Sequence, residues 1–147
     1  MATVTSSPRR SQRRSLVGLP FNKQLWAGRV LSAVPIALLT LSGVMKLMHQ
    51  PEFVGKWTSG LGWPESTLTS IGLLELLCVA LYVVPQTAVL GSVLLTGYLG
   101  GAIASHVRIG DPFVIPLVLG VLVWGGIYLR DERLRALLPR RSAPVAQ

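Results

Sequence analysis

Four long apolar runs, separated by short polar segments, divide the sequence. They cover about residues 30–48, 67–84, 88–106 and 112–129. A run of about 18 apolar residues can cross the hydrocarbon core of a bilayer as a helix, and large apolar side chains occur on every side of these runs, not on one face. The pattern therefore predicts an all-α integral membrane protein, a four-helix bundle with four spans.

The connections between the runs predict how the spans are joined. The turn at 85–87 is so short that the second and third spans must be antiparallel neighbours. The longest connection, 49–66, contains Pro51 followed by an acid, which is typical of a helix start, so we expect a short amphipathic helix at the membrane surface there. Before the fourth span, Asp111 and Pro112 predict an N-cap and a first helical position.

Small residues recur every fourth position in the third span. Gly97, Gly101 and Ser105 form one row, and Gly100 and Ala104 form a second. Small side chains let a neighbouring helix in a membrane approach closely. These rows therefore offer a surface for close packing by a neighbouring helix, which could be the second span.

The composition agrees with a membrane protein. Half of the 147 residues are hydrophobic and 14% are charged, with a mean hydropathy of +0.54, whereas a soluble domain carries about 25% charged residues. The formal net charge is +8, and its cations gather in the two tails that flank the spans. That distribution predicts that both termini are cytoplasmic, in a multi-pass protein of the bacterial plasma membrane.

The tails divide the chain into three parts. We expect a disordered basic cytoplasmic tail at 1–24, a membrane domain at 25–138 and a second disordered cytoplasmic tail at 139–147. Within the membrane domain, residues 130–139 continue as a short amphipathic helix along the inner surface. The tails lack the motifs of nucleic-acid-binding proteins, so we expect the bilayer and no nucleic acid as their partner.

Glu75 lies near the centre of the second span. An ionisable group in such a place is costly and by default marks a functional site. It lies eight residues from Thr67, so a rise of about 1.5 Å per residue places it roughly 12 Å beneath the outer end. Tyr98 reaches a similar depth in the third span. We expect Glu75 to form the floor of an outward-facing polar cavity, together with Lys46, Tyr98, His106, Arg108 and Asp111.

Two interpretations of Glu75 remain open from these residues. In one, Glu75 pairs with Lys46, or is protonated and hydrogen-bonded to Tyr98 or Ser105, and only holds the bundle together. In the other, Glu75 is a protonatable group in a ligand site. If the third span packs on the second, Tyr98 and Glu75 lie within hydrogen-bonding range.

Other chemistry is limited by what the sequence lacks. Cys78 is the single cysteine, which excludes an internal disulfide and a Cys-x-x-Cys motif. His49 and His106 are the two histidines, and we expect no metal site. No self-sufficient catalytic constellation is visible, so whether the protein is an enzyme stays open.

Four motifs carry a resemblance to a known family. They are Ser-Gly-Val-Met-Lys-Leu at 42–47, Gly-Trp-Pro at 62–64, Ile-Gly-Leu-Leu-Glu-Leu at 71–76, and the stretch from Tyr98 through Ser-His-Val-Arg-Ile-Gly-Asp-Pro at 105–112. The chain resembles the DoxX-like family of four-span bacterial membrane proteins over about residues 29–139. The resemblance implies a four-helix bundle with both ends cytoplasmic. Its matching polar positions are Lys46, Glu75, His106, Arg108 and Asp111.

The resemblance also implies an association with redox chemistry, because DoxD-type relatives are described as subunits of a thiosulfate:quinone oxidoreductase. It favours a quinone-interacting or redox-complex-associated membrane subunit with no covalently bound cofactor. In that function Tyr98, His106 or Lys46 donates a hydrogen bond to a quinone oxygen, and Glu75 handles its proton. The alternative is a non-enzymatic membrane protein that assembles or stabilises another protein. A small transporter, which would require an oligomer, is a third. The partner expected from the resemblance is a membrane or peripheral redox protein.

Overall fold

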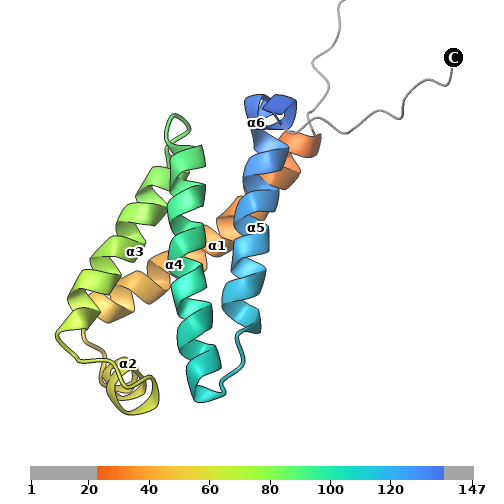
Figure 1. Cartoon of the computed structure of the whole chain (residues 1–147). Helices are drawn as coiled ribbons and strands as arrows, with labels where there is room; N and C mark the ends of the chain where they lie inside the picture. Colours follow the sequence, from red (N-terminus) through yellow and green to blue (C-terminus); the bar gives the residue numbers. More distant parts are fainter. Residues whose placement is uncertain (1–22, 138–147) are drawn as a thin grey trace, which may run out of the picture.

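The computed structural model describes residues 23–137, and within them the protein is all-helical, with no strands (Figure 1). The helices are α1 (Lys23–Leu47), α2 (Pro51–Gly55), a π-helical turn η1 (Lys56–Gly60), α3 (Thr67–Val83), α4 (Ala88–Ile109), α5 (Val114–Arg130) and α6 (Glu132–Leu137). The disorder predicted for residues 1–24 and 139–147 falls outside the described residues, except at residues 23 and 24. These two residues belong to α1.

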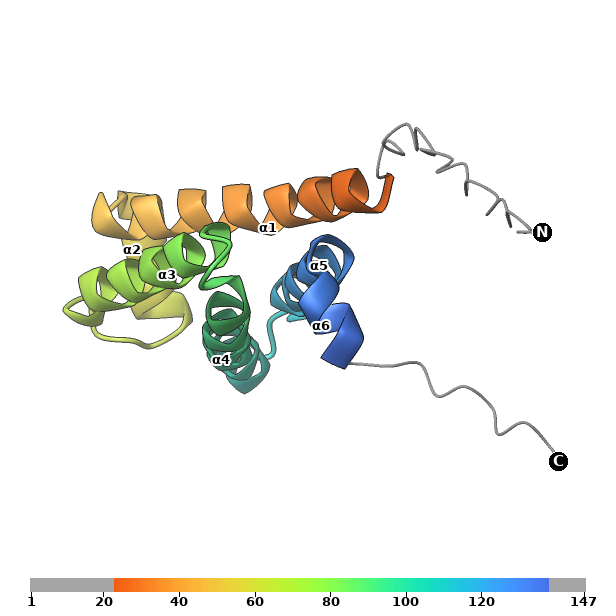
Figure 2. The same ribbon diagram turned by 90° about the horizontal axis from the view of Figure 1, so that it is seen from above.

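The four long helices contact one another in a ring. Helix α1 packs against both α3 and α5, and α4 closes the ring by packing against α3 and α5. Helix α1 crosses behind the other three, which lie side by side, and the view from above shows it along one side of the molecule (Figures 1 and 2). The core lies inside this ring, where Tyr82, Leu95, Val123 and Ile127 are fully buried.

Large apolar side chains also cover the outside of the ring. Leu41, Leu77, Val93 and Val121 are each more than half exposed, on α1, α3, α4 and α5 respectively. Helices α1 and α4 are long and apolar enough to cross a membrane, and α3 and α5 are apolar helices of 17 residues. Extended exposed apolar surface of this kind is rare on soluble monomers, so the outside of the ring is suited to lipid.

Helices α3 and α4 form the predicted antiparallel hairpin. The Thr87 hydroxyl donates to the Leu81 carbonyl at 2.8 Å across the turn. Gly91 faces the backbone of Tyr82 so closely that a Cβ atom at this position would overlap it. The close approach of the two helices therefore depends on a glycine near the turn.

The rows of small residues on α4 do not pack against α3. Helix α4 turns Ser92, Leu95 and Leu99 toward the core, and this leaves Gly97 and Gly101 on the outside, with no atom within 4 Å of where their Cβ would lie. The spacing of the larger side chains determines this orientation, since leucines fill the space between the helices and glycines do not.

The predicted start of the fourth span is also wrong. Helix α5 begins at Val114, and Asp111 is exposed and does not cap it. The Asp111 backbone N–H donates instead to the His106 carbonyl at 3.0 Å, and Gly110 adopts φ of 75°. These features are those of a Schellman motif, which ends α4. Asp111, which was predicted to begin the fourth span, therefore belongs to the end of the third.

The two short helical segments lie at opposite ends of the ring. The expected surface helix begins at Pro51 and continues through η1 to Gly60. At the other end, the chain bends at Asp131 before α6, and its carboxylate accepts hydrogen bonds from the backbone N–H of Arg133 at 2.8 Å and of Leu134 at 3.3 Å. Asp131 is thus the N-cap of α6, so the predicted inner helix is a separate element.

Candidate functional site

A buried ion pair joins α1 to α3. The Lys46 ammonium lies 2.8 Å from the Glu75 carboxylate, and the two side chains are 5% and 1% exposed. Lys46 also donates to the Ser42 hydroxyl at 2.6 Å. Within residues 23–137, no buried side-chain nitrogen or oxygen lacks a hydrogen-bond partner. The pair is therefore enclosed and fully satisfied.

Two glycines allow the helices to approach closely enough for this pair to form. A Cβ atom at Gly43 would lie 2.8 Å from the Leu76 side chain, and one at Gly72 would lie 3.0 Å from the Cβ of Lys46 and 3.2 Å from the Gly43 carbonyl. Because Gly43 and Gly72 face one another at the crossing of α1 and α3, Lys46 reaches Glu75 directly. The close packing of small residues expected on α4 occurs here instead.

The pair is covered on its outer side as well. The Lys46 ammonium lies 4.9 Å from the centre of the Phe53 ring, which α2 contributes. The Lys46 stem therefore bends inward to Glu75 instead of extending to the membrane surface. This arrangement differs from the expected open cavity with Glu75 at its floor, because the Lys46 and Glu75 side chains are paired and almost fully buried.

Two of the other predicted residues lie on α4. Tyr98 packs against the apolar core and lies close to Glu75. The His106 Nδ1 lies 2.8 Å from the Ala102 carbonyl of its own helix. Tyr98 thus lies beside the ion pair, whereas His106 is engaged locally.

Arg108 holds the outer connection against the end of α4. Its guanidinium donates to the Leu61 carbonyl and lies 4.9 Å from the centre of the Trp63 ring. Asp111 is exposed beyond the end of the same helix. Of the six predicted residues, the structure therefore brings Lys46, Glu75 and Tyr98 together, and it places the remaining three along the outer end of α4.

A second buried polar junction was not foreseen from the sequence. The Tyr82 hydroxyl lies 2.9 Å from the Ser32 hydroxyl and donates to the Val123 carbonyl at 2.9 Å, which joins α1, α3 and α5. A Cβ at Gly126 would meet both hydroxyls. The spacing of the sequence places Tyr82 on the same face of α3 as Glu75, and this signal could have identified Tyr82. Ser32 lies within an apolar run, and the residues around it do not indicate its role.

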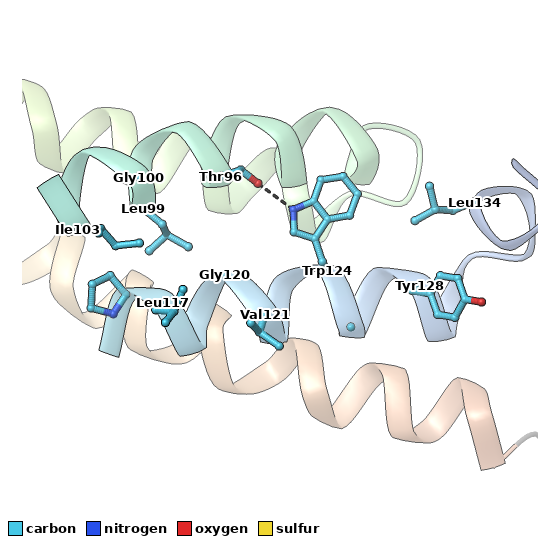
Figure 3. Close-up of a pocket in the computed structure, with 12 residues that line it drawn as sticks. Thr96, Leu99, Gly100, Ile103, Leu117, Gly120, Val121, Trp124, Tyr128 and Leu134 are labelled. Carbon is cyan, nitrogen blue, oxygen red and sulfur yellow. Dashed lines mark hydrogen bonds between the residues drawn. The ribbon is translucent and has the colours of Figure 1, made fainter. Parts of the chain in front are cut away.

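An apolar groove runs between α4 and α5 (Figure 3). It has a volume of about 650 Å³ and is open at the side. The Trp124 indole points across it and donates to the Thr96 hydroxyl at 2.8 Å, and Tyr128 lies toward the α6 end. The groove lining includes neither Lys46 nor Glu75. It is an apolar site, separate from the ion pair.

In the described part of the chain, no three His, Cys, Asp or Glu side chains come together. The sequence model of the DoxX-like family matches residues 30–126, from the middle of α1 to near the end of α5. Comparison with curated proteins and with solved structures finds no significant match.

Proposed function

The chain belongs to the DoxX-like family, and from this premise we propose that it is a multi-pass protein of the bacterial plasma membrane. In this proposal α1, α3, α4 and α5 are the four spans of a four-helix bundle, and both termini are cytoplasmic. The apolar exterior of the ring supports this assignment. So does the cation-rich composition of both tails, which favours the cytoplasmic side.

Within the membrane, we propose that the protein is a redox-complex-associated subunit that docks a partner through α4. The observation that carries this proposal is the uncovered face of Gly97, Gly100 and Gly101, where no atom of residues 23–137 lies within 4 Å of the position that a Cβ atom would take. Helices in lipid associate through such small residues because the backbones approach closely. Gly100 also borders the α4–α5 groove, so a transmembrane helix of the partner would find a continuous surface.

The Lys46–Glu75 pair has a different part in this proposal. Both charged groups are enclosed and bonded to each other, so neither is free to contact a substrate. We assign the pair to holding α1 against α3, and the docking face to α4. The subunit then contributes a surface to the redox complex, while the partner carries the reaction.

A crosslinking experiment tests this proposal. A photoreactive amino acid is placed at Gly101, and for comparison at Leu73, which is 56% exposed on α3. We expect irradiation of intact cells to give an adduct with a haem- or flavin-containing membrane protein from position 101 only. The further substitution Gly97→Leu should abolish it. An adduct of equal yield from position 73, or an adduct with a second copy of this chain alone, would contradict the proposal.

A second candidate function is quinone binding in the α4–α5 groove. Its wall is apolar and open at the side toward the surface suited to lipid, which fits an isoprenoid tail, and Thr96, Trp124 and Tyr128 offer polar atoms for the ring. Gly120→Leu would fill the groove, and Gly55→Leu is the matched control, because Gly55 has open space around it. If purified protein binds a quinone, only Gly120→Leu should weaken the binding. Equal binding by both variants would reject this site.

A further inference from the structure

We propose that a hollow at the α6 end of the bundle binds the phosphate-bearing headgroup of an anionic membrane phospholipid. The hollow has a volume of about 440 Å³ and lies between the start of α1, the α3–α4 turn and the junction of α5 with α6. Helix α1 begins and helix α6 lies at this end of the bundle (Figure 1). The inference rests on the proposed membrane topology, which places this end at the cytoplasmic leaflet, where anionic lipids face basic pockets.

Three arginines line the hollow: Arg29 from α1, Arg130 from α5 and Arg133 from α6. Two carboxylates also line it, but both have other partners. Asp131 accepts the backbone N–H groups that begin α6, and Glu132 lies 3.5 Å from the Arg135 guanidinium. The hollow therefore keeps an excess of positive charge.

One of the arginines is fixed in place. The Arg130 guanidinium donates to the Tyr82 carbonyl at 2.8 Å and lies 4.5 Å from the centre of the Tyr82 ring. That carbonyl is in the last turn of α3, where helix carbonyls lack partners within the helix. A guanidinium has five N–H donors, and this bond uses one of them. The Arg130 guanidinium is thus held in place and has further N–H groups that can donate to a ligand.

The other two arginines are available to a ligand. Arg29 and Arg133 are exposed, and within residues 23–137 neither side chain makes a hydrogen bond or ion pair to the protein. Arginine recognises phosphate oxygens through two parallel N–H donors. A phosphate between one fixed and two free guanidinium groups would receive charge-assisted bonds from three helices.

The surroundings favour a lipid over a free phosphate ion. The hollow has an apolar wall that includes Leu25, Ala88 and Ile127, and this wall suits the carbon atoms that join a headgroup to its acyl chains. Trp26 is next to Leu25 and is 55% exposed, and tryptophan is enriched at headgroup depth. The arginines and the apolar wall together match an amphipathic anion.

Lipid binding to the full-length protein in detergent tests the inference by native mass spectrometry. The probes are phosphatidylglycerol and phosphatidylcholine of equal chain length, with inorganic phosphate as a competitor. We expect wild type to bind phosphatidylglycerol more tightly, and Arg29→Gln with Arg133→Gln to weaken this binding on the order of tenfold. Arg29→Lys with Arg133→Lys keeps both charges but removes the paired donors, so its binding should lie between that of wild type and that of the glutamine variant, and it serves as a check that the fold tolerates changes here.

The control removes the same charge outside the hollow. Lys23→Gln with Lys56→Gln changes two exposed cations that neither line the hollow nor pair with its carboxylates, and we expect less than a twofold effect, by the same reasoning about site-specific bonds. Equal binding of the two lipids, equal losses in the two double variants, or full displacement by inorganic phosphate would overturn the inference. Because the measurement needs neither a partner nor an oriented membrane, its failure would leave the proposed docking function and topology standing.

Discussion

At the scale of single residues, the protein encloses two opposite charges and gives each a partner. A buried ion pair adds little net stability relative to apolar side chains, but loss of one partner leaves the other charge uncompensated. Lys46 and Glu75 are in this situation, with 5% and 1% of their side chains exposed. In the proposal made above, their value to the fold is the register that they impose on α1 and α3.

The tyrosine hydroxyls make a matched pair of predictions. Tyr82→Phe removes the hydroxyl that joins Ser32 to the Val123 carbonyl, and we expect it to lower the free energy of unfolding by about 1–2 kcal/mol. Tyr98→Phe removes a hydroxyl close to Glu75, whose carboxylate keeps Lys46 as its partner, and we expect a smaller change in stability, of less than about 0.5 kcal/mol. Thermal unfolding in detergent measures both. A larger loss from Tyr98→Phe would show that the hydroxyl near Glu75 has a structural role of its own.

At the scale of helices, the sequence predicts the elements better than their contacts. Long apolar runs fix where a helix can lie, and the three-residue turn at 85–87 fixes the α3–α4 hairpin. The glycines at the contacts, Gly43, Gly72 and Gly91, are not distinguishable in sequence from Gly97 and Gly101, which lie outside. Helix rotation depends on how all four helices fill their shared space, and this information is not local.

For the candidate site too, the sequence predicts where residues lie along the helices better than which residues they contact. The depth of Glu75 and a partnership with Lys46 both follow from helical rise and topology, so the pair was among the alternatives that the sequence offered. The enclosure of the pair was not predicted, because it depends on the Phe53 ring and on the contact between Gly43 and Gly72. Polar groups at one depth do not have to share one cavity, as His106 and Arg108 show.

Two glycines of α4 provide a prediction for helix packing. Gly91→Ala places a Cβ against the Tyr82 backbone, where neither helix can yield without separation, and we expect a loss of about 2–3 kcal/mol, as for overpacked cores. Gly101→Ala meets open space and should stabilise α4 by about 0.5–1 kcal/mol. Unfolding of the two variants by increasing denaturing detergent compares them directly. Equal effects would mean that the hairpin does not close on Gly91.

A second prediction at the scale of helices concerns Arg108, whose side chain links the connection between η1 and α3 to the end of α4. Arg108→Ala removes the donor to the Leu61 carbonyl and the cation above Trp63. We expect limited proteolysis near Gly60–Gly62 to accelerate several-fold, since local opening governs cleavage. His106→Ala, which removes a bond within α4 only, should leave that rate nearly unchanged. Equal acceleration in both variants would contradict the role given to Arg108.

At the scale of the whole molecule, charge and apolar surface together define how the protein sits in a membrane. The exterior of the ring is apolar on all four long helices, while arginines gather at the end where α1 begins and α6 ends. The α4 docking face and the arginine-lined hollow are different surfaces, and the proposed topology puts one within the membrane and the other at its cytoplasmic edge. In these two proposals, the partner and the lipid headgroup therefore bind at separate surfaces.

The orientation can be measured with single introduced cysteines. Native Cys78 is buried, so it should remain unlabelled by a membrane-impermeant thiol reagent. We expect Glu52→Cys and Asp111→Cys to be labelled in intact cells, and Glu132→Cys only after the membrane is opened, because the proposed topology places the first two outside. Labelling of Glu132→Cys in intact cells would reverse or refute that topology.

Whether Lys46 and Glu75 hold α1 against α3 is decided by a double-mutant cycle on unfolding free energies in detergent. Lys46→Met and Glu75→Leu each leave one buried charge alone, and each should lose about 3–5 kcal/mol. The double variant should lie within about 1.5 kcal/mol of wild type, because a well-packed apolar pair of similar volume replaces the ions. A double variant as unstable as the sum of its two single variants would contradict this role of the pair.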